Sequence, residues 1–158
     1  MRPFAALLAL AAALSACSGG GGDRYARSLP DARLPTLAGL PGPSLATCPT
    51  DKCLTVLVAP WCPICHRAAP SIVALRRLLD KDGVSSRVVV GSSDDLPAIK
   101  KFAAVFGADA LLDDGGVLNS RGVPCFLVTD RRGRVLKAVN GFPNVPSAEE
   151  LARYLDLI

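Results

Sequence analysis

Two cysteines spaced three residues apart carry the clearest chemical signal in this sequence. Cys62 and Cys65 enclose Pro63 and Ile64 in a Cys-Pro-Ile-Cys motif, and residues three apart on a helix are neighbours on its surface. Two such thiols can cycle between a dithiol and a disulfide. A structural disulfide or half of a zinc site has the same spacing, but the sequence has no second Cys-x-x-Cys and no pair of histidines to complete four ligands. The motif therefore favours redox chemistry.

The residues around the motif predict a strand before it and a helix after it. Residues 54–59 form a short apolar run that is typical of a buried parallel strand. A helix is expected from Pro63 to about Leu79, with Pro70 inside it. This order places Cys62 at a helix N-terminus, where unpaired N–H groups and the helix dipole favour an anion such as the nucleophilic thiolate. The second cysteine of the motif is then close enough to resolve a mixed disulfide.

The remaining patterns predict an α/β domain. We expect a strand over residues 87–91, followed by a helix from Leu96 to Phe106 that is capped by Asp94 or Asp95 and ended by Gly107. After a loop through residues 113–116, residues 125–129 and 135–140 should form a hairpin with its turn at 130–133. A closing helix should be capped by Ser147 and carry an apolar stripe of Leu151, Tyr154, Leu155 and Ile158. The order β-α-β-α-β-β-α predicts one central mixed sheet with helices on both faces.

Two segments resemble the thioredoxin superfamily, especially its TlpA-like periplasmic thiol–disulfide oxidoreductases. Residues 59–65, Ala-Pro-Trp-Cys-Pro-Ile-Cys, are similar to the active-site segment of that family. Residues 121–135 are similar to its cis-proline loop and hairpin, and Gly141 matches the glycine that follows the last strand. The resemblance covers roughly residues 45–158 and implies a thioredoxin fold in a single domain.

The resemblance also implies roles for individual residues. Cys62 would attack, Cys65 would resolve, and Trp61 would flank the site. Pro124 would follow a cis peptide bond and face the disulfide, with the Val123 backbone offering hydrogen bonds to an extended substrate strand; a trans proline in a plain turn is the alternative. The implied enzyme exchanges electrons with protein thiols or disulfides and with an unidentified redox partner, without a cofactor or a metal.

The sequence departs from that family at the residues that tune the reaction. Val56 stands six residues before the first motif cysteine, where thioredoxins bury an Asp that helps proton transfer. The Pro63-Ile64 dipeptide matches neither the Gly-Pro of reductive thioredoxins nor the Pro-His of the strong periplasmic oxidant. The direction of electron flow stays open, although TlpA-like relatives tend to be reductants. His66 either adds positive charge near the thiolates or is simply a polar position on the first helical turn.

Besides Cys17, three further cysteines lie outside the motif. Cys48 and Cys53 bracket a four-residue loop before the first strand, where either a local disulfide or two unrelated thiols would fit. Cys125 should lie near the Ala59 end of that strand, with its side chain turned away from the face that Pro124 presents. We expect Cys125 to be an inert buried thiol, with a third redox participant as the alternative.

The first residues predict export and lipidation. Residues 1–16 have a basic start and an apolar run at 4–14, as in a secretory signal. Leu-Ser-Ala-Cys, ending at Cys17, resembles a bacterial lipobox, in which the cysteine becomes the lipidated first residue; an ordinary signal with a chance cysteine is the alternative. Residues 17–44 are then a lipidated cysteine, a Gly-rich tether and a lead-in that packs on the domain or stays partly mobile. We expect anchoring to a membrane of the bacterial envelope, facing the periplasm or the cell exterior.

Composition narrows the other function classes. The formal net charge of +4 comes from 18 basic and 14 acidic side chains spread along the chain, which gives no basic patch for nucleic acid. A copper chaperone would use soft sulfur ligands, yet the chain has a single His, and its one Met is the first residue. That chaperone and a thioredoxin-fold scaffold with a purely structural pair remain the alternatives to an oxidoreductase.

Overall fold

The computed structural model describes residues 28–92, 95–118 and 120–158. The predicted signal peptide, Cys17 and the Gly-rich tether lie outside these residues. The elements are β1 (Arg33–Pro35), β2 (Pro41–Ser44), β3 (Lys52–Val58), α1 (Pro63–Lys81), β4 (Ser85–Gly91), α2 (Leu96–Ala103), β5 (Leu111–Asp113), β6 (Cys125–Asp130), β7 (Val135–Asn140) and α3 (Ala148–Tyr154). None of the described helices combines the length and the apolar character that crossing a membrane requires.

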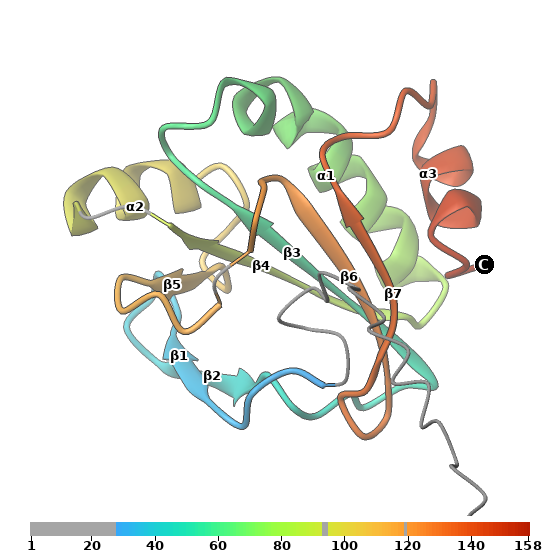
Figure 1. Ribbon diagram of the computed structural model, residues 1–158, viewed down its shortest axis with the longest axis horizontal. Helices are drawn as coiled ribbons and strands as arrows, with labels where there is room; N and C mark the ends of the chain where they lie inside the picture. Colours follow the sequence, from blue (N-terminus) through green and yellow to red (C-terminus); the bar gives the residue numbers. More distant parts are fainter. Residues whose placement is uncertain (1–27, 93–94, 119) are drawn as a thin grey trace, which may run out of the picture.

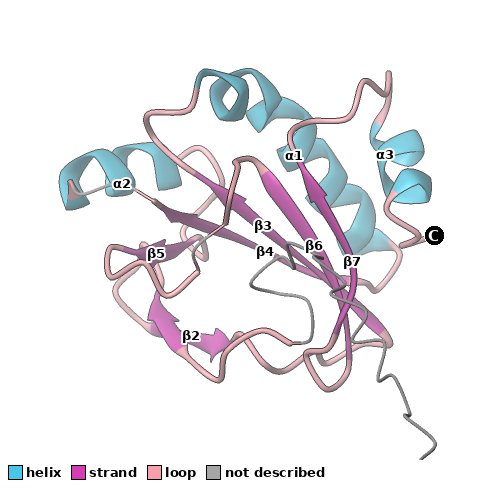
Figure 2. Cartoon of the chain, viewed as in Figure 1, coloured by secondary structure: helices cyan, strands magenta, loops and turns pink. Residues whose placement is uncertain are grey.

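A five-stranded mixed sheet forms the centre of the domain, in the order β5-β4-β3-β6-β7 (Figures 1 and 2). β3 and β4 are parallel, as are β4 and β5, whereas β6 is antiparallel to both β3 and β7. β3 lies in the middle and is buried along its whole length after Lys52, as a strand covered on both faces should be. The sheet and its helices confirm the predicted single-domain thioredoxin fold.

The sequence predicts helices on both faces of the sheet, but the structure covers the two faces in different ways. The buried side chains of α1, α2 and α3 all belong to one hydrophobic cluster with alternate residues of β3, β4 and β6. The opposite cluster combines the sheet with Leu29, Leu34 and Leu45 of the N-terminal segment and with Leu118. Among the residues that the structure describes, the second face is therefore covered by the lead-in and a loop, and by no helix.

The lead-in packs on the domain because a buried arginine holds it there. Arg87 of β4 donates to the carbonyl groups of Ser44 (2.8 Å) and Leu45 (2.7 Å) and to Thr55 Oγ1 of β3 (2.8 Å). Burial lowers the pKa of Arg87 to about 10. Two of its three hydrogen bonds go to backbone carbonyls of the lead-in and the third goes to β3, so the guanidinium links the lead-in to the sheet.

Element boundaries differ from the predictions at a few places. β1, β2 and β5 were not predicted, and α2 ends at Ala103 instead of Phe106. Asp95 is the N-cap residue of α2 but makes no side-chain capping bond, while Ser147 Oγ accepts from the Glu150 amide at 3.1 Å, as expected for α3. On that helix the predicted apolar stripe is wrong at its edge, because Tyr154 and Ile158 are about half exposed (46% and 50%).

Candidate active site

Cys62 occupies the junction between β3 and α1. It is the N-cap residue of α1, and its Sγ accepts a hydrogen bond from the Cys65 amide at 3.1 Å. Pro63 begins the helix, where its missing N–H leaves no donor unpaired. The strand ends and the helix begins within four residues, so the Cys65 amide in the first helical turn points at this sulfur. A thiolate at Cys62 therefore gains a hydrogen bond and the favourable end of the helix dipole.

Cys65 lies one helical turn into α1, with no exposed surface. Burial, followed by the hydrogen bond with Cys62, raises the pKa of the Cys65 thiol from its model-compound value of 9.0 to about 12. Cys65 therefore stays protonated at neutral pH. The two thiols of the motif therefore differ in their surroundings: Cys62 caps the N-terminus of α1, whereas Cys65 is buried in the first turn of that helix.

The loop before β6 lies directly against Cys62. The Val123–Pro124 peptide bond is cis, and the Cys62 thiol donates to the Val123 carbonyl at 3.3 Å. Pro124 is buried, while Val123 is partly exposed. The structure thus brings together four of the residues singled out in the sequence, although they are about 60 positions apart in the chain.

Trp61 projects beside the cysteine pair, with 61% of its surface exposed. Its indole N–H donates to the carbonyl of Ser92, the residue after β4. A hollow of about 340 Å³ runs from Trp61 and Ser92 to Arg121 and Val123. An exposed aromatic ring, fixed by a hydrogen bond at the edge of a hollow, is suited to pack against an incoming polypeptide.

The His66 ring contacts the turn before Cys62 and helix α2. Its Nε2 lies 2.6 Å from the Pro60 carbonyl oxygen, and its ring packs on Phe102 of α2 with 4.3 Å between the ring centroids. Neither of these contacts involves a motif sulfur atom. His66 instead ties the turn before Cys62 to α2.

The position of the thioredoxin carboxylate is occupied by a fully buried Val56. Val56 belongs to the same hydrophobic cluster as both motif cysteines. Among the residues that the structure describes, no three His, Cys, Asp or Glu side chains lie close enough to hold a metal ion. The surroundings of the pair are thus apolar, and a proton leaving Cys65 has no carboxylate at this position to receive it.

The other three cysteines that the structure describes lie apart from the exchange site. Cys48 and Cys53 form a disulfide at the start of β3, with 5.6 Å between their Cα atoms. Cys125 pairs with Leu57 in the sheet, near the end of β3 that leads to Cys62. Its side chain is buried in the cluster on the opposite face from the motif cysteines. Strand alternation therefore separates Cys125 from the pair, as predicted.

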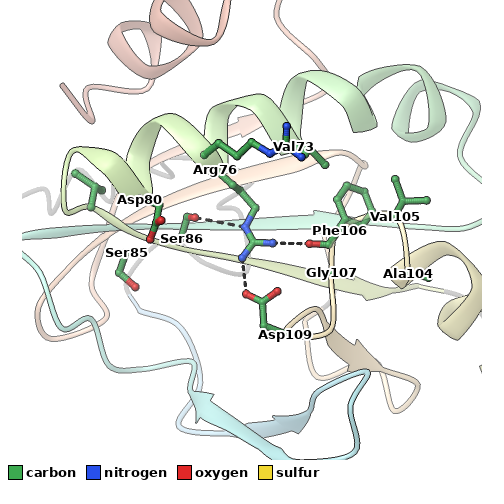
Figure 3. Close-up of a pocket in the computed structure, with 12 residues that line it drawn as sticks. Val73, Arg76, Asp80, Ser85, Ser86, Ala104, Val105, Phe106, Gly107 and Asp109 are labelled. Atoms are coloured by element: carbon green, nitrogen blue, oxygen red, sulfur yellow. Dashed lines mark hydrogen bonds and ion pairs between the residues drawn. The ribbon is translucent and has the colours of Figure 1, made fainter.

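A second hollow, of about 560 Å³, lies between α1, β4 and the end of α2 (Figure 3). Arg76 crosses it, donating to Ser86 Oγ (3.4 Å) and the Phe106 carbonyl (2.9 Å) and pairing with Asp109 (2.6 Å). Fourteen residues of helix separate Arg76 from Cys62, which is about 21 Å at 1.5 Å per residue. This hollow is therefore remote from the exchange site.

Comparison with known families accords with this geometry. The Redoxin family matches residues 26–155. The chain belongs to the Redoxin family. A search of curated proteins gave no match.

Solved structures show the same fold at low sequence identity. This redoxin is similar to a secreted disulfide oxidoreductase of Mycobacterium tuberculosis that is homologous to DsbE of E. coli (TM-score 0.62, 21% identity, covering 81% of this chain and 96% of that one). It is also similar to the exposed lipoprotein thioredoxin Etrx1 of Streptococcus pneumoniae (0.65, 19%, 82% and 100%) and to StoA of Bacillus subtilis (0.57, 19%, 79% and 98%). This redoxin is a thiol–disulfide oxidoreductase of the thioredoxin family.

Sequence reasoning missed several residues that shape the site of this redoxin. Ser92 holds Trp61, and Phe102 supports His66. Asp113 accepts from the amides of Val117 and Leu118, both at 2.7 Å, and so fixes the loop that lines the hollow. An acidic residue two positions before a Gly-Gly pair was the one available signal, because such residues often bond backbone amides nearby.

Proposed function

We propose that this redoxin is a lipid-anchored envelope reductase that passes electrons from Cys62 and Cys65 to disulfides of other proteins. The observation that carries the proposal is the unequal setting of the two thiols. Cys62 Sγ accepts a hydrogen bond from the Cys65 amide at the start of α1, whereas the Cys65 thiol is fully buried and has a pKa of about 12. Cys62 is therefore placed to attack the substrate disulfide, and Cys65 stays protonated until it resolves the mixed disulfide.

The reaction proceeds in two exchange steps. The Cys62 thiolate attacks one sulfur of a substrate disulfide, and the other substrate sulfur leaves as a thiolate that takes a proton from water. Cys65 then loses its proton to solvent and attacks Cys62 Sγ, which releases the substrate as a second thiol. Two electrons have moved to the substrate, and Cys62–Cys65 is now a disulfide. A redox partner returns two electrons to restore the dithiol.

The substrate approaches along the Val123–Pro124 loop. In the resting dithiol the Cys62 thiol donates to the Val123 carbonyl, and this bond is lost once Cys62 ionises. The carbonyl is then available to an N–H of an extended substrate strand, in the manner of strand addition. Trp61, exposed beside the loop, covers one side of the bound segment.

The polar contacts of the site support reduction as the direction. An oxidant of this kind is strong because its reduced, thiolate form is stabilised. Within the described part of the chain, the hydrogen-bond partners of Cys62 Sγ are the Cys65 amide and the Val123 carbonyl, and His66 binds Pro60 instead. Without a cationic side chain on the sulfur, the dithiol is not strongly favoured over the disulfide, so the pair gives up electrons readily.

The proposed location rests on the N-terminal sequence and on the printed descriptions of similar structures. Cys17 ends a lipobox-like tetrapeptide, and the similar structures include a secreted oxidoreductase and an exposed lipoprotein. The Cys48–Cys53 disulfide also suits an oxidising compartment.

A measured reduction potential tests the direction. We expect the Cys62–Cys65 couple, equilibrated with glutathione or dithiothreitol, to have a reduction potential of about −270 mV, and we expect the dithiol to reduce insulin. A potential near about −120 mV would identify an oxidant and overturn the proposed direction. Cys48→Ser/Cys53→Ser is the matched control, because it removes the other disulfide without touching the site.

Fatty-acid labelling tests the anchor separately. In the native envelope, the protein should incorporate labelled fatty acid and sediment with membranes, and Cys17→Ala should lose both properties. Unchanged labelling of Cys17→Ala would rule out this lipidation site. Because Cys17 lies far in sequence from the motif, the potential should be the same in both proteins.

A further inference from the structure

The N-terminal end of the described domain lies against the β6–β7 turn. Ser28 pairs with Arg134 in an isolated antiparallel bridge, and the Leu29 amide donates to the Gly133 carbonyl at 2.9 Å. Gly133 has a positive φ of 71°, and a Cβ atom there would lie 2.2 Å from the Ala46 carbonyl oxygen. The turn is therefore tightly built against the N-terminal segment, and any anchor on preceding residues is attached to the domain here.

This turn lies at the opposite end of the sheet from the exchange site. The β3–β6 register pairs Lys52 with Asp130 at one end and Leu57 with Cys125 at the other, beyond which the chain continues to Cys62. Five residue steps along β6 span about 17 Å at 3.4 Å per residue. In Figure 1 the β6–β7 turn lies at the bottom of the view, and the start of α1 lies at the top.

The turn carries an excess of exposed arginines. Arg131 and Arg134 are 68% and 70% exposed and pair with Asp51 (2.8 Å) and Asp130 (3.0 Å). Arg132 is also exposed, and its amide donates to Asp130. Surface pairs of this kind are weak, so the guanidinium groups can exchange carboxylates for phosphates, which they bind in a bidentate manner.

We propose that this hairpin pole, formed by Ser28, Asp51 and residues 130–134, rests on the anionic headgroups of the membrane that carries the lipidated Cys17. The exchange site then faces away from the bilayer, toward soluble protein substrates. The proposal rests on the lipid anchor proposed above. Asp23, Arg24 and Arg27, which lie between Cys17 and Ser28 in the sequence, add a net charge of +1.

The anchor alone would leave the orientation open. Eleven peptide bonds separate Cys17 from Ser28, a span of at most about 40 Å. A domain of this size has a radius of gyration of about 14 Å, so such a span reaches around much of it. The lipid chain keeps the domain close to the membrane surface, at a high effective concentration. A modest excess of positive charge is then enough to orient the pole toward the anionic headgroups.

The lone tryptophan offers a direct measurement of orientation. Trp61 is the single Trp of the chain and lies at the exchange site. The acylated protein is placed in vesicles of phosphatidylcholine with phosphatidylglycerol, with nitroxide-labelled headgroups as the quencher. We expect little quenching of Trp61 in these vesicles and more in phosphatidylcholine alone. Strong quenching in the anionic vesicles would overturn the proposal.

Charge reversal supplies matched variants. Arg131→Glu/Arg132→Glu should increase the quenching of Trp61 in the anionic vesicles. Lys100→Glu/Lys101→Glu makes the same charge change at exposed positions of α2, away from the pole, and should behave as wild type. Equal quenching in the two variants would overturn the proposal.

A soluble form separates this proposal from the anchor itself. Residues 29–157 supply the two hydrophobic clusters of the described domain, so the chain from Ser18 onward retains both of them. Its partition into sucrose-loaded phosphatidylglycerol vesicles should exceed that into phosphatidylcholine vesicles. It should fall by at least about fivefold for each reversed arginine of the pole, because each reversal removes one positive charge and adds a negative one. High salt should abolish the difference. Partition that is independent of vesicle charge overturns the role of the pole even where acylation of Cys17 is demonstrated, whereas an unacylated Cys17 refutes the anchor and the orientation together.

Discussion

Cys48 and Cys53 lie at the beginning of β3, whereas Cys62 and Cys65 follow its end. All four side chains are buried, with exposed fractions between 0% and 6%. The first pair is closed as a disulfide across five positions, and Thr50 inside its loop contacts both sulfur atoms (3.8 Å and 3.5 Å from its Oγ1). The second pair is associated with a helix N-terminus and the Val123–Pro124 loop.

The two pairs are alike in burial and differ in their surroundings, and we propose that this difference sets the exchanging pair apart. At Cys62 an amide of the next helical turn points at the sulfur, and a partly exposed loop lies beside it. At Cys53 the neighbouring polar group is a threonine hydroxyl that already donates to the Lys52 carbonyl at 2.6 Å. One end of β3 therefore presents a sulfur to a partner, while the other end ties a loop to the sheet.

Removing the attacking sulfur should have the largest effect. We expect Cys62→Ser to lower insulin reduction to the rate without enzyme and to trap no substrate. Cys65→Ser should accumulate mixed disulfides through Cys62, because nothing resolves them. Trapped species are counted on non-reducing gels after alkylation.

The Cys48→Ser/Cys53→Ser variant tests the contrast between the two ends of β3. It should keep the insulin-reduction rate of wild type, since it leaves Cys62 and Cys65 unchanged. Loss of activity in that variant, or equal trapping by Cys62→Ser and Cys65→Ser, would show that the two pairs do not differ in the way proposed.

The raised pKa of Cys65 should make the stability of the reduced protein depend on alkaline pH. Burial and the bond with Cys62 raise that pKa from 9.0 to about 12. An unfolded chain releases the Cys65 proton near the lower value, while the folded chain keeps it to the higher one. Stability due to this group is therefore complete below pH 9 and falls as pH rises toward 12, by up to about 1.4 kcal/mol per pH unit.

Urea unfolding of the reduced protein at increasing pH measures that slope. Cys65→Ala provides the control, because the other alkaline groups titrate in both proteins and only Cys65 differs. Equal slopes for the two reduced proteins would contradict the raised pKa. The oxidised protein should also lack the Cys65 contribution, since a disulfide does not titrate.

Local patterns in the sequence were enough to predict the centre of the fold. The apolar run at 54–59 and the Cys-Pro-Ile-Cys motif each depend on neighbouring residues, and β3 and α1 form where they indicate. The Cys125 side chain lies on the predicted face because strand alternation is also a local rule.

Elements that depend on distant contacts were not predictable in the same way. β2 has the sequence Pro-Gly-Pro-Ser, which has little strand propensity. It forms because Gly42 lets the backbone approach Leu111 and Leu34, where a Cβ atom would be 2.4 Å and 2.6 Å from their atoms, and because Arg87 binds the adjoining Ser44 carbonyl. At the site, the link between Trp61 and the chain after β4 likewise appears only once the sheet is assembled.

Removing the structural disulfide should lower stability moderately. For a loop of six residues, the chain-entropy estimate gives a loss of about 2 kcal/mol in the free energy of unfolding for Cys48→Ser/Cys53→Ser. Urea unfolding of the oxidised proteins measures it, with Cys125→Ala as a comparison for an unrelated buried cysteine. A change below about 0.5 kcal/mol would mean that the loop is held by its other contacts and not by the disulfide.

The smallest expected effect concerns the hydroxyl that accompanies that disulfide. Thr50 Oγ1 accepts from the Ser85 amide at the start of β4 (3.2 Å) and donates to the Lys52 carbonyl. Thr50→Val keeps the branched shape but leaves both backbone groups without this partner, which should lower the free energy of unfolding by about 1 kcal/mol. Thr50→Ser keeps the hydroxyl and should retain most of that stability. If valine and serine are equally destabilising, then the methyl group, and not the hydrogen bonding, is what Thr50 contributes to this end of β3.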